Sequence, residues 1–152
     1  MCIRDSGITA VIEPINGGRD VIRGGDAYTT YGMRGFFLNH VRDAVRIIEK
    51  VNHPNLRLHL DFYHVQLTDG NLAETLKETI DLIHHIQIAG VPGRNEPDLG
   101  EIHYPFLFDL IDQLGYEGWV GCEYKPWGKT VDGLGWAQRY GIGAPKDVTA
   151  PP

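Results

Sequence analysis

Cysteine is scarce in this sequence, and a long apolar run is absent. The 152 residues include 2 cysteines, Cys2 and Cys122, which are too few for a disulfide framework and suit a reducing compartment. The apolar runs are far shorter than the roughly 20 residues that cross a bilayer. No apolar signal region follows Met1. These absences predict a cytoplasmic protein with no disulfide scaffold and no membrane partner.

Basic residues are also few. Lys and Arg number 14 against 20 Asp and Glu, which gives a formal net charge of −6, and no stretch of the chain is strongly basic. Nucleic acid binding needs clustered Lys and Arg to meet the phosphates, so no nucleic acid partner is expected. A G-x-G-x-x-G turn after a strand-like segment is absent as well, which weakens any prediction of a dinucleotide site.

What the chain does have is an alternation of short apolar segments with amphipathic ones. Segments rich in Ile, Val, Leu and aromatic residues predict strands over residues 8–15, 56–62, 84–89 and 118–124. Apolar residues spaced three and four apart predict helices over residues 37–51, 72–82 and 105–114, with a short last helix over 131–140. Strands that alternate with helices indicate parallel strands joined by crossovers.

Two α/β architectures fit this alternation: a doubly wound sheet and part of an eight-stranded α/β barrel. A complete barrel takes about 250 residues, so this chain would supply about four of its eight strand–helix units. We expect that part to occupy residues 7–140. Residues 1–6 read as an unrelated leader, and residues 141–152, which include three prolines, as a flexible tail.

Alternate residues of each predicted strand differ in polarity. Leu56, Leu58 and Leu60 share one face of the second strand, because side chains alternate between the two faces of a sheet. The same alternation places Cys122 on an apolar face, where we expect a small buried residue. The opposite faces of the four predicted strands end in oxygen-bearing side chains, namely Glu13, Asp61, Gln87 and Glu123.

These four side chains predict a site for a hard cation. In α/β barrels the carboxyl ends of the strands carry the active site, and unpaired carboxylates that meet there repel one another unless a divalent cation joins them. Oxygen donors favour Mg²⁺ or Mn²⁺ over zinc. A nitrogen-rich zinc site built from His59, His84 and His85 is the alternative, and the better-placed carboxylates count against it.

The segments that carry these residues resemble the hydroxypyruvate isomerase family, which belongs to the xylose-isomerase-like barrel superfamily. The resemblance covers residues 7–140 in order. It rests on the runs Ile12-Glu13-Pro14, Leu60-Asp61-Phe62-Tyr63-His64, His85-Ile86-Gln87-Ile88-Ala89-Gly90, Pro92-Gly93-Arg94-Asn95-Glu96-Pro97, Gly100-Glu101-Ile102 and Gly121-Cys122-Glu123-Tyr124-Lys125-Pro126.

The resemblance implies a fold, a reaction and a role for each site residue. The fold is the C-terminal half of a (β/α)8 TIM barrel, with the first four strands absent from this chain. The reaction is the metal-dependent interconversion of hydroxypyruvate and tartronate semialdehyde. The implied residues are the Mg²⁺ or Mn²⁺ ligands Glu13, Asp61, Gln87 and Glu123, the catalytic acid/base pair Glu13 and Glu123, and the substrate-binding residues His64 and Arg94.

Several alternatives stay open at this point. The substrate of such a barrel is a small hydroxy-oxo acid, but a 2-oxo-tetronate or a ketose fits the same ligand set. A chain with half of the strands is also expected to be inactive alone, and to need a homo-oligomer or the missing N-terminal half, because unpaired strand edges invite association. Phosphodiester cleavage of DNA is disfavoured by the net charge of −6.

Overall fold

The computed structural model describes residues 7–17, 33 and 35–142. Along this part of the chain the elements are β1 (Ala10–Ile12), α2 (Val41–Val51), β2 (Leu56–Asp61), α3 (Phe62–Thr68), α4 (Leu72–Thr79), the 3-10 turn η1 (Ile80–Leu82), β3 (Ile83–Ile88), α5 (Tyr104–Gln113), β4 (Trp119–Cys122) and the 3-10 helix η2 (Asp132–Tyr140). The expected leader and the expected tail beyond residue 142 lie outside the described residues. None of the helices in the described part is long and apolar enough to cross a membrane.

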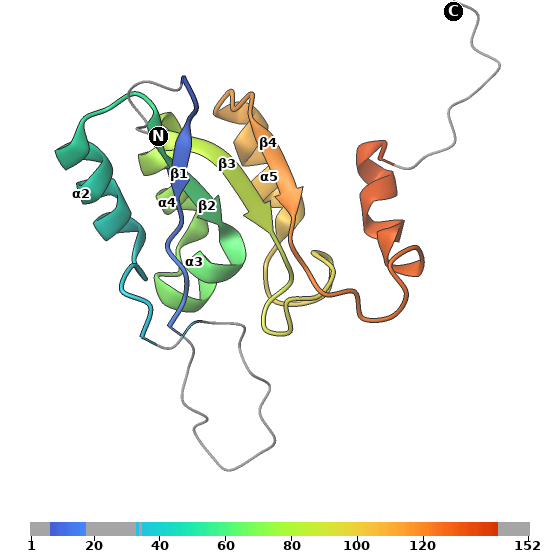
Figure 1. The fold of residues 1–152 in the computed structure, drawn as a ribbon. Coiled ribbons are helices and arrows are strands. Elements are labelled where there is room, and N and C mark those ends of the chain that lie inside the picture. Colours follow the sequence, from blue (N-terminus) through green and yellow to red (C-terminus); the bar gives the residue numbers. More distant parts are fainter. Residues whose placement is uncertain (1–6, 18–32, 34, 143–152) are drawn as a thin grey trace, which may run out of the picture.

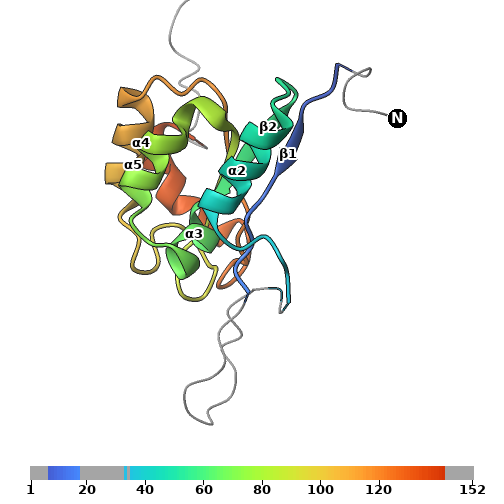
Figure 2. The ribbon, with the colours of Figure 1, turned by 90° about the vertical axis from the view of Figure 1, so that its left-hand side faces the viewer.

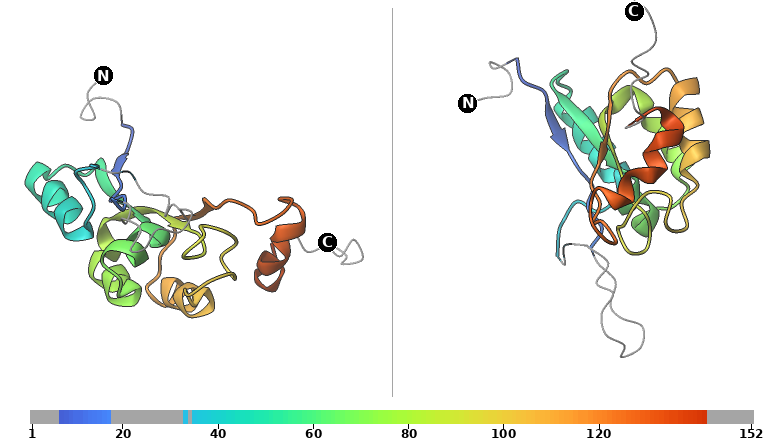
Figure 3. Two further views of the ribbon diagram at one scale, coloured as in Figure 1. Left: turned by 90° about the horizontal axis from the view of Figure 1, so that it is seen from below. Right: turned by 90° about the vertical axis from the view of Figure 1, so that its right-hand side faces the viewer.

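The four strands form one parallel sheet whose spatial order is the order of the chain, β1-β2-β3-β4. Ala10 pairs with Leu56, and Gln87 pairs with both Asp61 and Gly121. Helices α2, α4 and α5 lie on one face of the sheet; in Figure 1 α4 and α5 are behind the strands and α2 is to the left of β1, and Figure 2 and Figure 3 show the helical layer from other sides. The predicted α/β arrangement with parallel strands is confirmed, and all four carboxyl ends meet at one edge.

The core lies between the sheet and these helices. Leu58, Leu60 and Ile86 are 0% exposed, since each points from its strand toward the helical layer. On the helices, Ala44 and Leu76 are also 0% exposed, and they meet the strands from the other side. The predicted alternation is therefore confirmed for the two central strands, where each apolar residue in phase is buried.

The opposite face of the sheet is less covered. Val11 is 39% exposed, and His59 and Gln87 are half-buried. On the helical side, Cys122 was expected to be buried and is exposed, although it lies beside Ile88 and Phe108. That prediction is wrong because Cys122 ends β4, an edge strand that pairs on one side only among the described strands.

Both edge strands are shorter than predicted. The first runs over Ala10–Ile12 instead of 8–15, and the last over Trp119–Cys122 instead of 118–124. Pro14 lacks the N–H that would continue the ladder after β1. The shortening leaves Glu13 and Glu123 one residue beyond their strands, on loop backbone at the carboxyl edge of the sheet.

Helix boundaries shift in the same way. Helix α2 begins at Val41 and not at residue 37, because the Asp69 carboxylate accepts the N–H of Val41 at 3.0 Å and caps the first turn. Helix α3 was not predicted. It begins directly after Asp61, whose carboxylate accepts the N–H of Tyr63 at 2.9 Å. The last predicted helix is a 3-10 helix, Asp132–Tyr140.

Candidate active site

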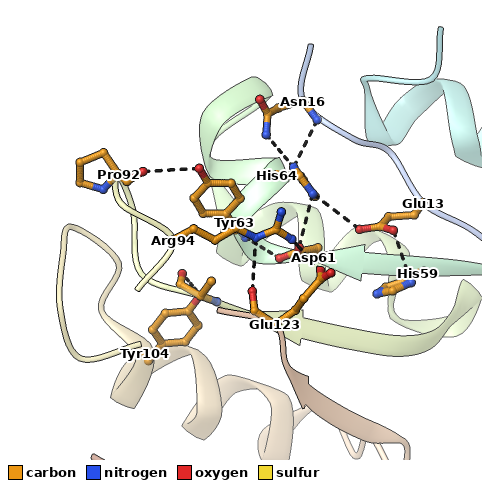
Figure 4. Close-up of polar contacts among 11 residues, drawn as sticks. Glu13, Asn16, His59, Asp61, Tyr63, His64, Pro92, Arg94, Tyr104 and Glu123 are labelled. Carbon is orange, nitrogen blue, oxygen red and sulfur yellow. Dashed lines mark hydrogen bonds and ion pairs between the residues drawn. The ribbon is translucent and has the colours of Figure 1, made fainter. Parts of the chain in front are cut away.

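Four adjacent strands bring the predicted oxygen-bearing residues to one edge of the sheet. Asp61 ends β2 and pairs with Gln87 of β3, while Glu13 and Glu123 follow the two outer strands. Figure 4 shows Glu13, Asp61 and Glu123 around the carboxyl ends of these strands. The parallel topology explains this arrangement, since residues at equivalent strand ends share an edge.

The tightest cluster joins Glu13, Asp61 and His64. One ligand atom from each lies within 4.8 Å of the other two, and this group could hold a metal ion. His64 Nε2 is 3.8 Å from a Glu13 oxygen and 3.6 Å from Asp61 Oδ2. His64 reaches these carboxylates because α3 starts immediately after β2 and places its first turn over the strand end. The resemblance assigned His64 to the substrate, and the structure places it beside two predicted ligands.

Arg94 links the carboxylate of Glu123 to this cluster through its ion pair with Asp61. Its Nη2 donates to Asp61 Oδ2 at 3.0 Å and to Glu123 Oε2 at 2.6 Å. Its guanidinium carbon lies 4.8 Å from the ring centre of Tyr63, a cation–π distance, as Figure 4 shows. With a side chain only 15% exposed, Arg94 is an ion-paired residue of the site and not a solvated loop charge.

The orientation of His64 is fixed by Asn16. The backbone N–H of Asn16 lies 3.3 Å from His64 Nδ1, and the Asn16 side-chain amide lies 2.6 Å from the same atom. A backbone N–H can only donate, so Nδ1 is an acceptor and the proton of a neutral ring is on Nε2. That proton then faces the carboxylates of Glu13 and Asp61. Asn16, 4% exposed, is a site residue that the sequence patterns did not single out.

Burial and crowding weaken both acids of the cluster. Burial, followed by the charges of Asp61 and Glu123, raises the pKa of Glu13 to about 7. Burial also raises the pKa of Asp61 to about 6, against the lowering effect of the Tyr63 N–H and of Arg94. Each shift means that the ionised carboxylate lacks part of the stabilisation it has in water. A divalent cation beside both groups would supply that stabilisation.

Two histidines are neutral in this setting. Burial, then the charge of Arg94, lowers the pKa of His64 to about 4. Burial, then the charge of His85, lowers the pKa of His59 to about 4. His59 Nδ1 lies 3.8 Å from Glu13, and its ring meets His85 edge-on at 5.0 Å. In the described part of the chain, neither His84 nor His85 belongs to a group that could hold a metal, so the nitrogen-rich zinc alternative finds no support.

Gln87 supplies a further feature that fits a cation. Its side-chain oxygen is buried and makes no hydrogen bond of normal geometry among the described residues, although the Gln87 side chain lies close enough to His59 to act on the pKa of that ring, against the larger effect of burial. A buried amide oxygen without a partner costs free energy, and a metal ion is one group that would remove that cost. Gln87 lies between the Asp61 and Gly121 positions of the ladder, in the middle of the predicted ligand set.

Comparison with known proteins identifies the class to which this fold and this site belong. The chain belongs to the xylose isomerase-like TIM barrel family, which its sequence matches over residues 2–140. Among curated relatives it is 47% identical over 134 residues to 2-oxo-tetronate isomerase of Cupriavidus necator, covering 88% of this chain and 46% of the relative. It is 46% identical over 136 residues to a putative hydroxypyruvate isomerase of Xenopus laevis, covering 89% and 45%. The resemblance to hydroxypyruvate isomerase is thus confirmed.

Solved structures agree with this assignment. A family 2 AP endonuclease of Brucella melitensis superposes with a TM-score of 0.77 at 43% identity, covering 88% of this chain and 47% of that one. A 3-keto-D-glucoside 4-epimerase of E. coli gives a TM-score of 0.68 at 25% identity, covering 88% and 46%. The chain spans about half the length of the relatives it matches, so its described strands form part of a TIM barrel.

Proposed function

We propose that this chain carries the metal and acid/base site of an isomerase that interconverts hydroxypyruvate and tartronate semialdehyde. The observation that supports this most directly is the meeting of Glu13, Asp61, Arg94 and Glu123 at the carboxyl ends of adjacent parallel strands. The relatives named as isomerases support the reaction class.

The cation that suits this site is Mg²⁺ or Mn²⁺, held by Glu13, Asp61, Gln87 and Glu123. The buried, unpartnered oxygen of Gln87 and the raised pKa of Glu13, about 7, are the structural grounds for the fit. His64 takes another role, because its Nδ1 accepts from Asn16 and its Nε2–H is left as a donor. A bound divalent cation polarises the substrate carbonyl and stabilises the oxygen charge that develops on it.

The two glutamates are the proton carriers in this proposal. Isomerisation moves a carbonyl between neighbouring carbons: a proton leaves one carbon, an enediolate forms, and a proton is returned to the other carbon. Glu13 and Glu123 follow the two outer strands and can therefore flank a small substrate. In the metal-free chain burial raises the pKa of Glu13 to about 7, and a bound cation would lower it again by stabilising the carboxylate.

Arg94 and His64 are assigned to substrate oxygens. A guanidinium binds a carboxylate through two parallel hydrogen bonds. Arg94 lies 4.8 Å from the ring centre of Tyr63 and pairs with Asp61 and Glu123, so it stands beside the proposed cation. The Nε2–H of His64 points into the same cluster, where it can donate to a substrate oxygen. Neither residue carries the transferred proton in this scheme.

A 2-oxo-tetronate is the second candidate substrate. A curated relative, 47% identical over 134 residues, is named 2-oxo-tetronate isomerase. A 2-oxo-tetronate shares the carbonyl and the carboxylate of hydroxypyruvate and has one more carbon. The same Glu13, Glu123 and Arg94 roles serve both acids, so the ligand set alone does not separate them.

The chain is also proposed to be the C-terminal half of the barrel. Its partner is then the N-terminal half or a second copy of itself, because β1 and β4 are edges of the described sheet and parallel strands are normally covered on both sides. Alone, the chain should have little activity. The scarcity of cysteine supports a cytoplasmic location.

The test is an isomerase assay on the purified chain with Mg²⁺ or Mn²⁺, using hydroxypyruvate and a 2-oxo-tetronate as separate substrates. It is run with and without the purified N-terminal half of the Cupriavidus necator relative, and the mass of each sample in solution is measured. We expect metal-dependent turnover only when a barrel is completed. Strong turnover by a monomeric chain would refute the half-barrel proposal, and no turnover on either acid by a completed barrel would refute the isomerase proposal.

A further inference from the structure

A buried carboxylate lies beside the site, and the proposed reaction does not use it. Glu96, in the loop between β3 and α5, is only 3% exposed. Both of its oxygens accept the backbone N–H of Trp127, each at 3.1 Å. No other hydrogen bond to this carboxylate is present in the part of the chain that the structure describes. Burying a carboxylate with so few donors costs free energy, so a benefit elsewhere must offset it.

The surroundings of Glu96 are tightly built. A Cβ atom at Gly133 would lie 2.2 Å from Glu96 Oε1, and a Cβ at Gly90 would lie 2.5 Å from the Glu96 carbonyl oxygen. The loop also closes on itself, because Gly90 N–H donates to Asn95 at 2.8 Å and Leu99 N–H donates to Glu96 at 2.9 Å. Glycine is required at residue 90, where the contact is with backbone oxygens, whereas a Cβ at residue 133 would displace the Glu96 side chain from its present position.

The residues just before Glu96 bind the same segment. Lys125 N–H donates to the Arg94 carbonyl at 2.7 Å. The Asn95 side-chain amide donates to the Lys125 carbonyl at 2.8 Å, and Arg94 Nε donates to the Glu123 carbonyl at 3.2 Å. Residues 94–96 therefore bind every second residue of 123–127. We call these two segments, with the hydrogen bonds between them, the loop clamp.

The loop clamp begins where the β4 strand ends. The N–H of Glu123 donates to Ile88 at 3.2 Å, and the β4 strand has already ended at Cys122. β4 is an edge strand of the described sheet, and the Glu123 side chain is 54% exposed. The position of Glu123 therefore depends on this one hydrogen bond to β3 and on its contacts with the Arg94 loop.

We propose that Glu96 is a positioning residue: by binding the Trp127 N–H it closes the loop clamp and sets the distance between Arg94 and Glu123. This inference rests on the proposed function, which gives Glu123 and Arg94 their roles. Among the described residues, the Glu96 carboxylate hydrogen-bonds to Trp127 and makes no ion pair with Glu13, Asp61 or His64. Its effect is carried by the backbone of residues 123–127 to the carboxylate of Glu123 and to the Arg94 guanidinium.

The experiment compares four forms of the full 152-residue chain: the native sequence, Glu96→Gln, Glu96→Asp and the control Asp98→Asn. Gln keeps the length of the side chain and one accepting oxygen. Asp keeps the charge but is one methylene shorter, so it no longer reaches the Trp127 N–H. Asp98 is exposed and lies two residues away in the same loop.

Two measurements are made on each form. NMR records the hydrogen-exchange rates of the Trp127 and Lys125 N–H groups and the chemical shift of the Arg94 Nε–H. Calorimetry records the affinity for Mn²⁺. In Glu96→Asp we expect about tenfold faster exchange of Trp127, the effect of losing one hydrogen bond. We also expect Mn²⁺ binding weaker by about 10–100-fold, as when a residue that orients a ligand is lost. Glu96→Gln and Asp98→Asn should stay close to the native chain.

The outcomes separate the inference from the proposed function. If Glu96→Asp keeps the Trp127 exchange rate and the Arg94 signal, the loop clamp does not depend on Glu96. If exchange accelerates while Mn²⁺ binding is unchanged, Glu96 is merely structural, and the positioning role is overturned. If the native chain itself binds no Mn²⁺, the metal part of the proposed function fails. The Arg94 Nε–H signal then decides the inference: a shift in Glu96→Asp that is absent in Glu96→Gln supports it, and no shift overturns it.

Discussion

The two faces of the sheet are made by the same strands, but one face forms the core and the other carries the candidate site. On the helical side, Leu58, Leu60 and Ile86 are 0% exposed and form the core. On the other side, His59 Nε2 and Gln87 Oε1 are buried without a hydrogen-bond partner among the described residues, and the acid Glu13 has its pKa raised to about 7. The helical face buries apolar side chains against one another, whereas the other face buries polar atoms that have no hydrogen-bond partner among the described residues. Because side chains alternate along a strand, a single sequence can place stability on one face and chemistry on the other.

The largest effect should come from a change at the site that leaves the core intact. In a completed barrel, Glu123→Gln should lower kcat/KM by about 10²–10⁴-fold, the usual contribution of an acid/base group. The unfolding free energy should hardly change, because the Glu123 side chain is 54% exposed. Steady-state kinetics and urea unfolding measure the two quantities. Glu117→Gln, an exposed glutamate before β4, is the control, and near-normal turnover in Glu123→Gln would exclude it as a proton carrier.

The core face should show the opposite pattern. Leu60→Ala removes a side chain that is 0% exposed and should lower the unfolding free energy by about 2–5 kcal/mol, the usual cost of such a cavity. Val11→Ala, on the other face and 39% exposed, should lower it far less. Urea unfolding followed by circular dichroism compares the two variants. Equal losses would contradict the division of labour between the faces.

Metal binding at the polar face of the sheet should raise the unfolding free energy of the chain. Mn²⁺ at about 100 times its dissociation constant should stabilise the native chain by about 2.7 kcal/mol. Asp61→Asn should remove this gain, while the α3 cap survives because Asn also caps helices. Thermal unfolding with and without Mn²⁺ measures the gain, with Glu49→Gln, an exposed acid on α2, as control. A full gain in Asp61→Asn would rule out Asp61 as a ligand.

The smallest effect is a pH dependence that comes from Glu13. The native pKa of Glu13 is about 7, against 4.5 for an unperturbed glutamate, so the unfolded chain gives up this proton first as the pH rises. Glu13 therefore contributes stability that is complete below 4.5 and is lost as the pH rises through 7. Asp61 acts in the same direction, whereas His64, whose pKa is lowered to about 4, loses stability as the pH falls.

Comparing the native chain with Glu13→Gln isolates the contribution of Glu13 to the pH dependence of stability. Urea midpoints of the metal-free chain and of Glu13→Gln are compared at about pH 5 and about pH 8, on either side of the Glu13 transition. We expect the native chain to lose more stability than the variant over this interval. Parallel pH profiles would show that the Glu13 pKa is not raised.

Much of this division was predictable from the sequence. The alternation in β2 predicted which residues face the helices, because Leu56, Leu58 and Leu60 leave only one apolar side. The parallel order followed from the alternation of strands and helices. The convergence of Glu13, Asp61, Gln87 and Glu123 on a metal stays a prediction, because the structure brings the residues to one edge without testing the ion.

Other parts depended on contacts that no local pattern reveals. Helix α3 was hidden because its apolar start, Phe62 to Val65, continues the apolar run of β2. The available signal was Asp61, a residue type that caps helices. The hydrogen bonds of Arg94 and Glu96 join residues about thirty positions apart, and His64 depends on Asn16 across 48 positions. Such pairs follow from the fold and cannot be found from spacing.

The identity of strand order and chain order has a consequence for the route of folding. The entropy lost in closing a loop grows with its length. The connection from β2 (Leu56–Asp61) to β3 (Ile83–Ile88) is the shortest of the three between neighbouring strands. We therefore expect β2 and β3 to dock first through α3 and α4, with β1 and β4 added later. Pulse-labelled hydrogen exchange should show early protection of the two central strands, and earlier protection of β1 would contradict this order. Asp61 and Gln87 would then be in place before Glu13 and Glu123 arrive, so the proposed proton carriers would be the last parts of the site to assemble.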